Sequence, residues 1–367
     1  MAQSRCQICG ERELVSSALG ACADCIRDKT KRALPFIREA HIRSRIQFGL
    51  PLEPPKHGVR CGLCVNECRI SPGERGYCGL RTNKDGKLVH LGGTSEKGIV
   101  QCYYDPLPTN CVAANVCPGG TGAGYPRFSH SKSGPEYGYH NLAVFYGACS
   151  FDCLFCQNWH YREMASHLTP TMSARELASQ VDEKTSCICF FGGDPTPQLP
   201  HAIETSEVAL KDAEDILRIC WESNGTMSLP LLKRIAKLSL DTGGNIKFDL
   251  KVWDEDLHKA LCSVTNARTL ENFRWLAEYG KQRPDPPFLT ASTLLIPGYV
   301  DVKEVTNIAK FIADLNPGIP YSLLAFYPQF YMDDLPTTSR KHAERCIEAA
   351  RKAGLQNIRL GNVHLLR

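Results

Sequence analysis

The spacing of the cysteines constrains this chain more than any other feature of its sequence. The 367 residues include 19 cysteines, and the first four form two C-x2-C pairs, Cys6 with Cys9 and Cys22 with Cys25. Two such pairs can place four thiolates around one tetrahedral zinc ion. Because so short a segment cannot bury a core, the metal would supply its folding energy. We expect a zinc-ribbon-like module with a basic helix over residues 1–50; a rubredoxin-like iron site or a redox pair is the alternative.

A second set of four cysteines lies in the segment 51–140. Its members are Cys61, Cys64, Cys68 and Cys78, in the pattern C-x2-C-x3-C-x9-C. Zinc and an iron–sulfur cluster both accept four cysteines, so either is possible. A long, glycine-rich stretch follows at 102–140, which we expect to be a loop. It contains Cys102, Cys111 and Cys117, which form a third metal site or remain ordinary thiols.

A third set has only three members. The stretch GACSFDCLFCQNW contains Cys149, Cys153 and Cys156, with no fourth cysteine close behind. A metal site normally needs four ligands, so this set is one ligand short. A plain zinc site completed by His160 is the alternative.

Charge and hydropathy exclude some classes of function. The net charge of +4 is too small by itself to indicate nucleic-acid binding, although the first 60 residues hold 11 Lys and Arg against 6 Asp and Glu. No apolar run approaches the roughly 18 residues of a transmembrane helix, and the sequence starts without a secretory signal. The cysteines are then expected to be reduced thiols or metal ligands. We predict a cytoplasmic protein in a reducing, oxygen-poor setting, with no membrane partner.

The segment 141–367 alternates short apolar runs with helical patterns. Strands are predicted at 142–146, 187–191, 216–221, 246–250, 289–296 and 321–326. Six strands that alternate with helices indicate an α/β fold, a parallel sheet that curls into a partial (β/α)6 barrel. Five cysteines of this segment lie within predicted strands and helices, where we expect ordinary buried thiols. These are Cys187, Cys189, Cys220, Cys262 and Cys346.

Polar or glycine-rich groups follow successive strands of this barrel. They are FFGGDPT, WESNG, FDLK and LLIPGY, with Gly192 and Gly193 placed to let a ligand approach the backbone closely. In α/β barrels the loops after the strands form the reactive face. The three-cysteine loop follows the first strand, so we expect these groups to meet it at one end of the barrel.

The barrel segment resembles the radical S-adenosylmethionine (radical SAM) superfamily, and within it the branch of pyruvate formate-lyase activating enzyme and its uncharacterised relatives. CSFDCLFC is similar to the cluster loop of that family, and GGDPT to its GGE motif, with Asp in place of Glu. WESNG and DLK are similar to further cofactor-contact positions. The resemblance covers roughly 140–367, and the CGLCVNEC…GYCGLR segment is similar to the leader of a subgroup.

The resemblance implies a role for each matching residue. Cys149, Cys153 and Cys156 would hold a [4Fe–4S] cluster whose fourth iron S-adenosylmethionine chelates. Among the cofactor-binding residues, Phe155 would contact the adenine, and Gly192, Gly193 and Asp194 would contact the methionyl amino group. Ser223 and Asn224 would contact the ribose or the carboxylate, and Lys251 would contact the carboxylate. Glu222 and Asp249 would lie near a monovalent cation, and Pro297 and Gly298 would lie where the fifth strand ends.

The function implied is an enzyme that reductively cleaves S-adenosylmethionine and abstracts hydrogen through a 5′-deoxyadenosyl radical. Relatives suggest a protein or peptide substrate, here entering between the loop 102–140 and the strand ends, and an electron donor such as flavodoxin or ferredoxin. Alternatives are an RNA-modifying or small-molecule radical SAM enzyme, or a non-catalytic zinc-ribbon protein that binds nucleic acid. We expect residues 1–50 to be dispensable for cleavage.

Overall fold

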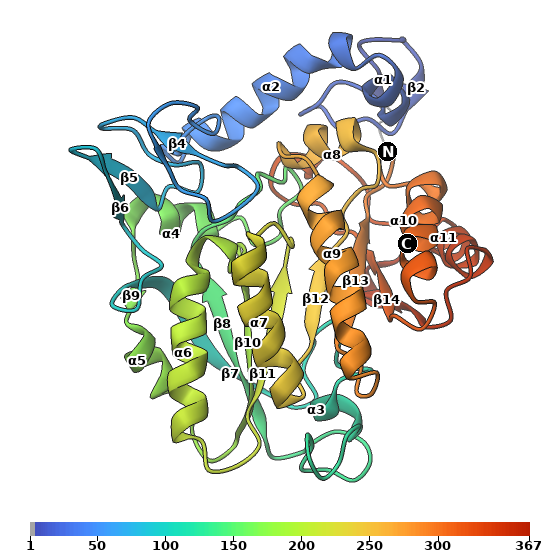
Figure 1. Cartoon of the computed structure of the whole chain (residues 1–367). Helices are drawn as coiled ribbons and strands as arrows, with labels where there is room; N and C mark the ends of the chain where they lie inside the picture. Colours follow the sequence, from blue (N-terminus) through green and yellow to red (C-terminus); the bar gives the residue numbers. More distant parts are fainter. Residues whose placement is uncertain (1–3) are drawn as a thin grey trace.

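The computed structural model describes residues 4–367 and centres on a nine-stranded sheet (Figure 1). The strand order is β15-β14-β13-β12-β11-β10-β8-β7-β9. Seven neighbouring strands run parallel: β8 (His140–Tyr146), β10 (Thr185–Gly192), β11 (Arg218–Ser223), β12 (Ile246–Asp249), β13 (Leu289–Leu295), β14 (Tyr321–Ala325) and β15 (Ile358–Gly361). Apolar side chains fill both faces of the central strands, as expected where helices cover a parallel sheet.

The six predicted strands are confirmed, and the structure adds three more to the same sheet. β15 is a seventh parallel strand. β7 (Gly98–Pro106) and β9 (Thr171–Met172) extend the other side antiparallel, with Cys102 of β7 opposite Val144 of β8. The sheet therefore begins at Gly98, within the segment that we expected to precede the barrel.

Helices follow most of the parallel strands and pack on the outer face of the sheet, as Figure 1 shows for α6, α7 and α9. Their bounds are α4 (Tyr161–His167), α5 (Ala174–Ala178), α6 (Leu199–Asp212), α7 (Leu229–Thr242), α8 (Glu255–Cys262), α9 (Ala267–Tyr279), α10 (Val302–Leu315) and α11 (Arg340–Lys352). In α7, Leu232, Ile235, Ala236 and Ser239 are buried, the spacing of one helical stripe. None of the helices of residues 4–367 is long and apolar enough to cross a membrane.

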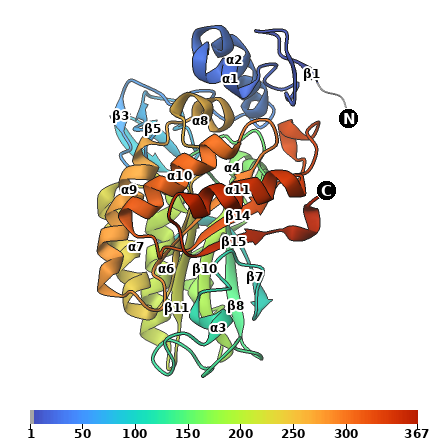
Figure 2. The same ribbon diagram turned by 90° about the vertical axis from the view of Figure 1, so that its right-hand side faces the viewer.

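The N-terminal module lies across the end of the barrel where the parallel strands finish (Figures 1 and 2). It consists of β1 (Ser4–Arg5), β2 (Arg12–Glu13), α1 (Ala23–Asp28) and α2 (Thr30–Ile46). The predicted basic helix is α2. Its buried residues include Ile37, His41 and Arg45, whereas Leu34 is 57% exposed.

Two antiparallel hairpins connect this module to β7: β3 (Val59–Arg60) with β4 (Arg69–Ile70), and β5 (Arg81–Lys84) with β6 (Lys87–His90). Asp85 and Gly86 form the turn between β5 and β6, both with positive φ, which is the geometry of a type I′ hairpin.

The segment between β7 and β8 corrects one expectation. It contains the short helix α3 (Pro118–Thr121) and lies at the opposite end of the barrel from α2 (Figures 1 and 2). A buried ion pair anchors it, with Arg218 Nη2 at 2.7 Å from Glu136 Oε2. The segment therefore does not cover the strand ends as a lid. It fills the barrel from the opposite end, and we call residues 107–139 the plug.

Candidate active site

A cavity of about 300 Å3 opens at the carboxyl ends of the parallel strands. The three-cysteine loop after β8 contributes Cys149, Cys153 and Cys156 to its wall. The plugging segment contributes Asn110 and Val112 from below. The structure thus brings the loop and the ends of several different strands to one space, as the sequence predicts.

The three thiols of the loop are held apart rather than gathered. Cys149 Sγ accepts hydrogen bonds from Asn224 Nδ2 and from the backbone amide of Phe151, both at 3.3 Å. Cys153 Sγ lies 3.6 Å from Cys262 Sγ. Within residues 4–367, the three thiols do not form a group with all ligand atoms within 4.8 Å of one another. His160 is exposed and does not join them, so the alternative of a single zinc ion completed by His160 loses its support.

Asp152, in the middle of the loop, is fully buried in a cluster of ionic groups. Its carboxylate accepts from Arg162 Nη2 at 2.7 Å and lies 2.9 Å from His41 Nδ1; the Ser44 hydroxyl also donates to it. Burial would raise the pKa of Asp152, but Arg162, His41 and Arg45 hold that pKa well below its ordinary value. Side chains of α2 therefore fix the conformation of the three-cysteine loop.

Asp194 braces the loop against the end of β11. Its Oδ2 accepts from the Ser150 hydroxyl at 2.9 Å, and its Oδ1 accepts from the Ser223 hydroxyl at 2.7 Å and from the Asn224 amide at 3.3 Å. Burial raises the pKa of Asp194, and these hydrogen bonds oppose that rise. Asp194 and Ser223 thus lie behind the cavity wall, whereas the sequence predicted both in contact with a cofactor.

Gly192 and Gly193 line the cavity, yet packing explains why both are glycines. A Cβ on Gly193 would lie 2.2 Å from the Ala148 carbonyl oxygen, and one on Gly192 would lie 2.4 Å from the Tyr146 amide nitrogen. The end of β10 therefore packs directly on the backbone at the end of β8, closer than any side chain permits. The sequence-based reason, close approach of a ligand, is not needed to account for them.

Charged side chains form a continuous chain along one wall. Lys247 Nζ lies 3.1 Å from Glu222 Oε2 and 2.8 Å from Asp249 Oδ1, and Lys251 Nζ lies 2.9 Å from Asp249 Oδ2. Burial would lower the pKa of Lys251, but Asp249 and the thiols of Cys153 and Cys262 raise it well above its ordinary value. A permanent positive charge therefore stands beside the cysteine loop.

Seven of the predicted cofactor-binding residues line the cavity: Phe155, Gly192, Gly193, Glu222, Asn224, Asp249 and Lys251. Pro297 and Gly298 do not. Gly298 has φ of 82° and lies so near the N-terminal module that a Cβ would be 2.1 Å from the Leu14 carbonyl oxygen. This exit turn positions the module, not the cavity.

Sequence reasoning missed several polar residues of the wall. Ser292 of β13 pairs in register with Asp249 and donates to it at 2.6 Å. Asn158 donates to the Gly192 carbonyl at 3.1 Å, and Asn362 follows β15 with a positive φ. The predicted Asp249 could have indicated Ser292, because inward positions of adjacent parallel strands lie side by side. Asn362 could not be predicted to line the cavity, because β15 was not predicted as a strand.

The four N-terminal cysteines form a compact group. The ligand atoms of Cys6, Cys9, Cys22 and Cys25 all lie within 4.8 Å of one another. Metal–sulfur bonds of 2.3 Å in a tetrahedral zinc site put the sulfurs about 3.8 Å apart, so this spacing fits one ion. Burial would raise the pKa of Cys6, but hydrogen bonds from nearby backbone amides lower it to about 6.

The second cysteine set is more open. Within the described residues, Cys61, Cys64, Cys68 and Cys78 are not gathered to single-ion spacing. Burial and the thiols of Cys78, Cys68 and Cys61 raise the pKa of Cys64 well above its ordinary value. The segment docks on the cysteine loop through Asn66 Nδ2, which donates to the Ser150 carbonyl at 2.7 Å.

Comparisons with known proteins agree with this geometry. Residues 143–312 match the family model of the radical SAM superfamily. An uncharacterised protein of Methanocaldococcus jannaschii is 25% identical over 313 residues, 83% of this chain and 81% of that protein. A putative glycyl-radical enzyme activating enzyme of the same organism is 29% identical over 48% of this chain and 64% of its own length.

Among solved structures, a domain of pyruvate-formate lyase-activating enzyme from Bacteroides vulgatus is 23% identical, with a TM-score of 0.38 over 47% of this chain and 98% of that domain. The family match spans β8 to α10 and includes the cysteine loop. Residues 143–312 of this chain are therefore a radical SAM domain.

Proposed function

We propose that this enzyme binds a [4Fe–4S] cluster through Cys149, Cys153 and Cys156, binds S-adenosylmethionine beside it, and abstracts hydrogen from a protein or peptide. The match of residues 143–312 to the radical SAM family model supports the cluster and S-adenosylmethionine. When bound and reduced, the cluster supplies the electron that cleaves S-adenosylmethionine into methionine and a 5′-deoxyadenosyl radical. The observation that carries the proposal is that three separated thiols of one loop face a single cavity of about 300 Å3.

The donor set fits such a cluster. Three thiols spaced too widely for one ion suit a core of several atoms, and cysteine thiolates are the usual ligands of iron–sulfur clusters. Asn224 would donate to the ligand sulfur of Cys149, and Lys251 would balance negative charge near Cys153. Phe155, only 3% exposed, would offer an apolar face for the adenine.

Two finer assignments change with the structure. Lys247 and Lys251 already pair with Glu222 and Asp249, where we expected a monovalent cation, so our proposal assigns no cation there. Asp194 accepts hydrogen bonds from Ser150 and Asn224, so we assign it a positioning role. In our proposal the backbone of Gly192 and Gly193 contacts the methionyl amino group instead.

The remaining metal assignments follow the spacing of the thiols. Single-ion spacing supports zinc at Cys6, Cys9, Cys22 and Cys25. Wider spacing supports an iron–sulfur cluster at the set that begins with Cys61. All 19 cysteines are free thiols, which supports a reducing, cytoplasmic setting. Our proposal keeps flavodoxin or ferredoxin as the electron donor.

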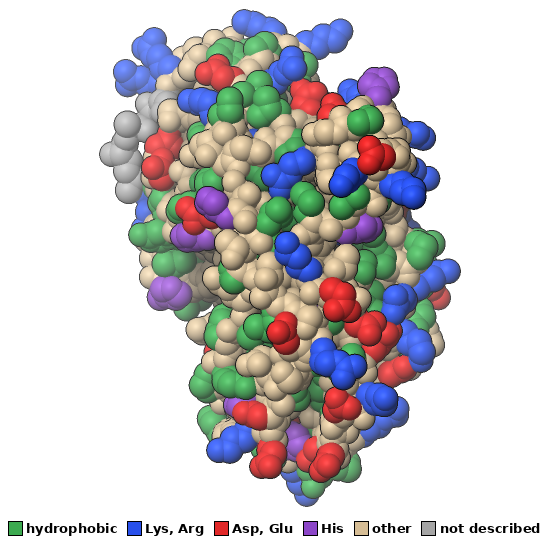
Figure 3. Space-filling model, turned by 90° about the vertical axis from the view of Figure 1, so that its left-hand side faces the viewer, with side chains coloured by type: hydrophobic (Ala, Val, Ile, Leu, Met, Phe, Trp, Pro, Cys, Tyr) green, Lys and Arg blue, Asp and Glu red, His purple; other side chains and the backbone are tan. Residues whose placement is uncertain are grey.

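The substrate class rests on the relatives and on the surface. The name of the second relative describes an enzyme that activates a glycyl-radical enzyme, which supports a protein substrate here. Nucleic acid is a weaker alternative. The buried His41 and Arg45 of the basic helix are already engaged with Asp152, and Figure 3 shows basic side chains on one face interspersed with acidic and apolar ones.

The test compares anaerobically reconstituted protein with a variant in which Cys149, Cys153 and Cys156 are all Ala. With a strong reductant and S-adenosylmethionine, the full chain should release 5′-deoxyadenosine and methionine, and the triple variant should release neither. Cys346→Ala removes a buried thiol of α11 that does not line the cavity; it is the matched control and should keep full release. Undiminished release from the triple variant contradicts the cluster assignment.

A second arm tests the substrate class. The protein fraction and the small-metabolite fraction of an anaerobic lysate are added separately to the reconstituted enzyme. We expect the protein fraction to accelerate 5′-deoxyadenosine release. Acceleration by the metabolite fraction alone contradicts a macromolecular substrate and leaves the cluster assignment intact.

A further inference from the structure

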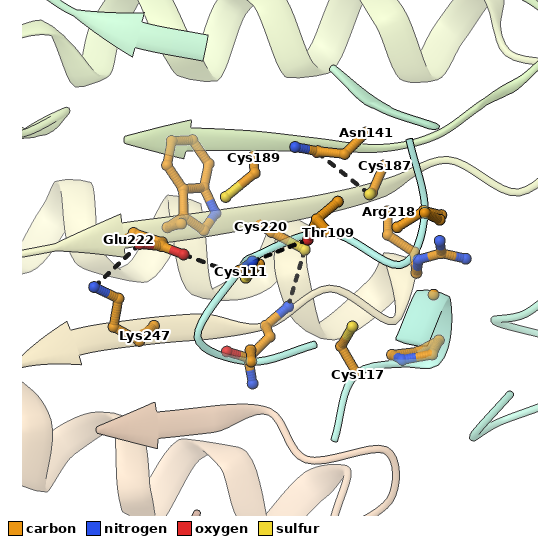
Figure 4. A pocket seen from close by; sticks show the side chains of 16 residues that line it. Thr109, Cys111, Cys117, Asn141, Cys187, Cys189, Arg218, Cys220, Glu222 and Lys247 are labelled. Carbon is orange, nitrogen blue, oxygen red and sulfur yellow. Dashed lines mark hydrogen bonds and ion pairs between the residues drawn. The ribbon is translucent and has the colours of Figure 1, made fainter. Parts of the chain in front are cut away.

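A second, smaller cavity of about 40 Å3 lies deeper in the barrel, and five cysteines line it. Figure 4 shows their origins: two come from β10, one from β11, and two from the segment that plugs the barrel. They are Cys187 and Cys189, Cys220, and Cys111 and Cys117. Glu222 and Lys247 line both this cavity and the larger one, so the two spaces adjoin.

The fold brings these thiols together from three distant segments. Side chains two apart on a strand share a face, so Cys187 and Cys189 both point into the barrel. The register pairs Cys189 with Cys220 on the neighbouring strand. The plug then adds Cys111, whose thiol donates to Glu222 Oε1 at 3.2 Å, and Cys117, beneath it. The sequence predicted ordinary buried thiols for the strand cysteines and left those of the plug undecided.

The plug that supplies Cys111 and Cys117 is fixed in place. Arg218 donates to Glu136 and to the Phe128 carbonyl within the plug, and to the Ser186 hydroxyl of β10. On the far side, Arg359 of β15 donates to Asn115 of the plug at 3.0 Å. The five thiols therefore face one another across a rigid, preformed space rather than meeting in a mobile loop.

We propose that four of these five cysteines bind a further metal centre of more than one atom, an iron–sulfur cluster. Thiolates are soft ligands that select iron–sulfur clusters, zinc or copper. Within residues 4–367 these thiols, like those of the catalytic loop, are not gathered to the spacing of a single ion, which favours a polynuclear core. Arg218 and Lys247 line the same cavity, and each is also paired with carboxylates, Arg218 with Glu136 and Lys247 with Glu222 and Asp249.

The size of the cavity supports an inorganic occupant. A water needs roughly 10–15 Å3 of such volume, so about 40 Å3 holds only a few atoms and no organic ligand. Packing alone explains the cysteines less well. Interiors are close-packed, and five small side chains chosen only to fill space would not face a void at their centre.

The test uses the full chain in a background that already lacks the catalytic cysteines at 149, 153 and 156, so that its result does not depend on the proposed function. Cys187→Ala with Cys220→Ala is compared with a matched control, Cys102→Ala with Cys346→Ala, which removes two thiols outside the cavity. Iron, sulfide, zinc and copper per chain are measured after anaerobic reconstitution, with Mössbauer spectra of the iron.

The proposal expects the cavity variant to lose two or more irons per chain and matching sulfide relative to the control, and Cys111→Ala with Cys117→Ala to lose the same amount. The second pair lies in the plug, so it preserves the test if the strand variant fails to fold. Equal iron and sulfide in folded variants and control overturns the proposal. Loss of a single zinc or copper ion without sulfide also overturns it.

Discussion

The N-terminal cysteine group and the three-cysteine loop both present cysteine thiols, but they arrange them differently. The N-terminal group is closed: four thiols from about 20 residues of sequence lie within 4.8 Å of one another. The loop is open: three separated thiols face a cavity of about 300 Å3. Short-range spacing is sufficient to build the closed site, whereas the open site needs the whole barrel.

The two regions are also joined. His41 and Ser44 of α2 contact Asp152, between Cys149 and Cys153. We expected residues 1–50 to be dispensable for S-adenosylmethionine cleavage. The contacts now give a physical reason to expect that removing α2 loosens the loop, because the buried Asp152 would lose three of its partners, His41, Ser44 and Arg45.

Removing the closed site should give the largest effect. Cys6→Ser with Cys9→Ser should abolish binding of one zinc per chain and unfold the N-terminal module, because the metal supplies its folding energy. Zinc content and proteolysis of the first 50 residues measure this. Iron bound by Cys149, Cys153 and Cys156 should persist at a reduced level. Zinc content equal to that of the unaltered chain contradicts the single-ion assignment.

Removing the contacts between α2 and the three-cysteine loop should give the next largest effect. Asp152→Ala leaves Arg162 and His41 buried without their partner, so the free energy of unfolding should fall by about 3–5 kcal/mol. Anaerobic denaturant titration measures it. Glu207→Ala removes a carboxylate from a solvent-exposed pair with Arg234 and should cost less than about 1 kcal/mol. Equal costs for the two substitutions would refute the special role of Asp152.

The close packing beneath the loop should matter somewhat less. Gly193→Ala places a Cβ 2.2 Å from the Ala148 carbonyl oxygen, so the backbone before Cys149 must move, at a cost of about 1–3 kcal/mol. Gly318→Ala, whose Cβ would meet only the Asn316 side chain at 3.2 Å, is the control. Thermal unfolding and iron retention distinguish them. Indistinguishable behaviour would show that the loop tolerates displacement.

The hydrogen bond to the ligand sulfur should have the smallest effect. Asn224→Ala removes the side-chain amide that donates to Cys149 Sγ at 3.3 Å. Losing a hydrogen bond of about 1 kcal/mol should lower the reduction potential of the cluster by a few tens of millivolts. Asn158→Ala, which lines the same cavity but donates to a backbone carbonyl, should leave the potential unchanged. A redox titration followed by absorbance compares the two.

Local patterns predicted the fold and part of the site. The apolar runs gave six of the parallel strands, the C-x2-C pairs gave the compact group, and the groups after the strands did meet the loop. Contacts between distant segments stayed hidden. Asp152 and His41 are 111 residues apart, and the five-thiol cavity depends on the register that pairs Cys189 with Cys220. We predicted that the turn at Gly298 lines the cavity, because the sequence does not reveal its contact with Leu14.

The central claim is that the three-cysteine loop leaves a metal position open to S-adenosylmethionine. Low-temperature electron paramagnetic resonance of the reduced full chain, with and without S-adenosylmethionine, tests it most directly. We predict that S-adenosylmethionine changes the spectrum of the cluster and that the change is absent when Cys149, Cys153 and Cys156 are replaced by Ala. Identical spectra of the full chain with and without S-adenosylmethionine would contradict the account.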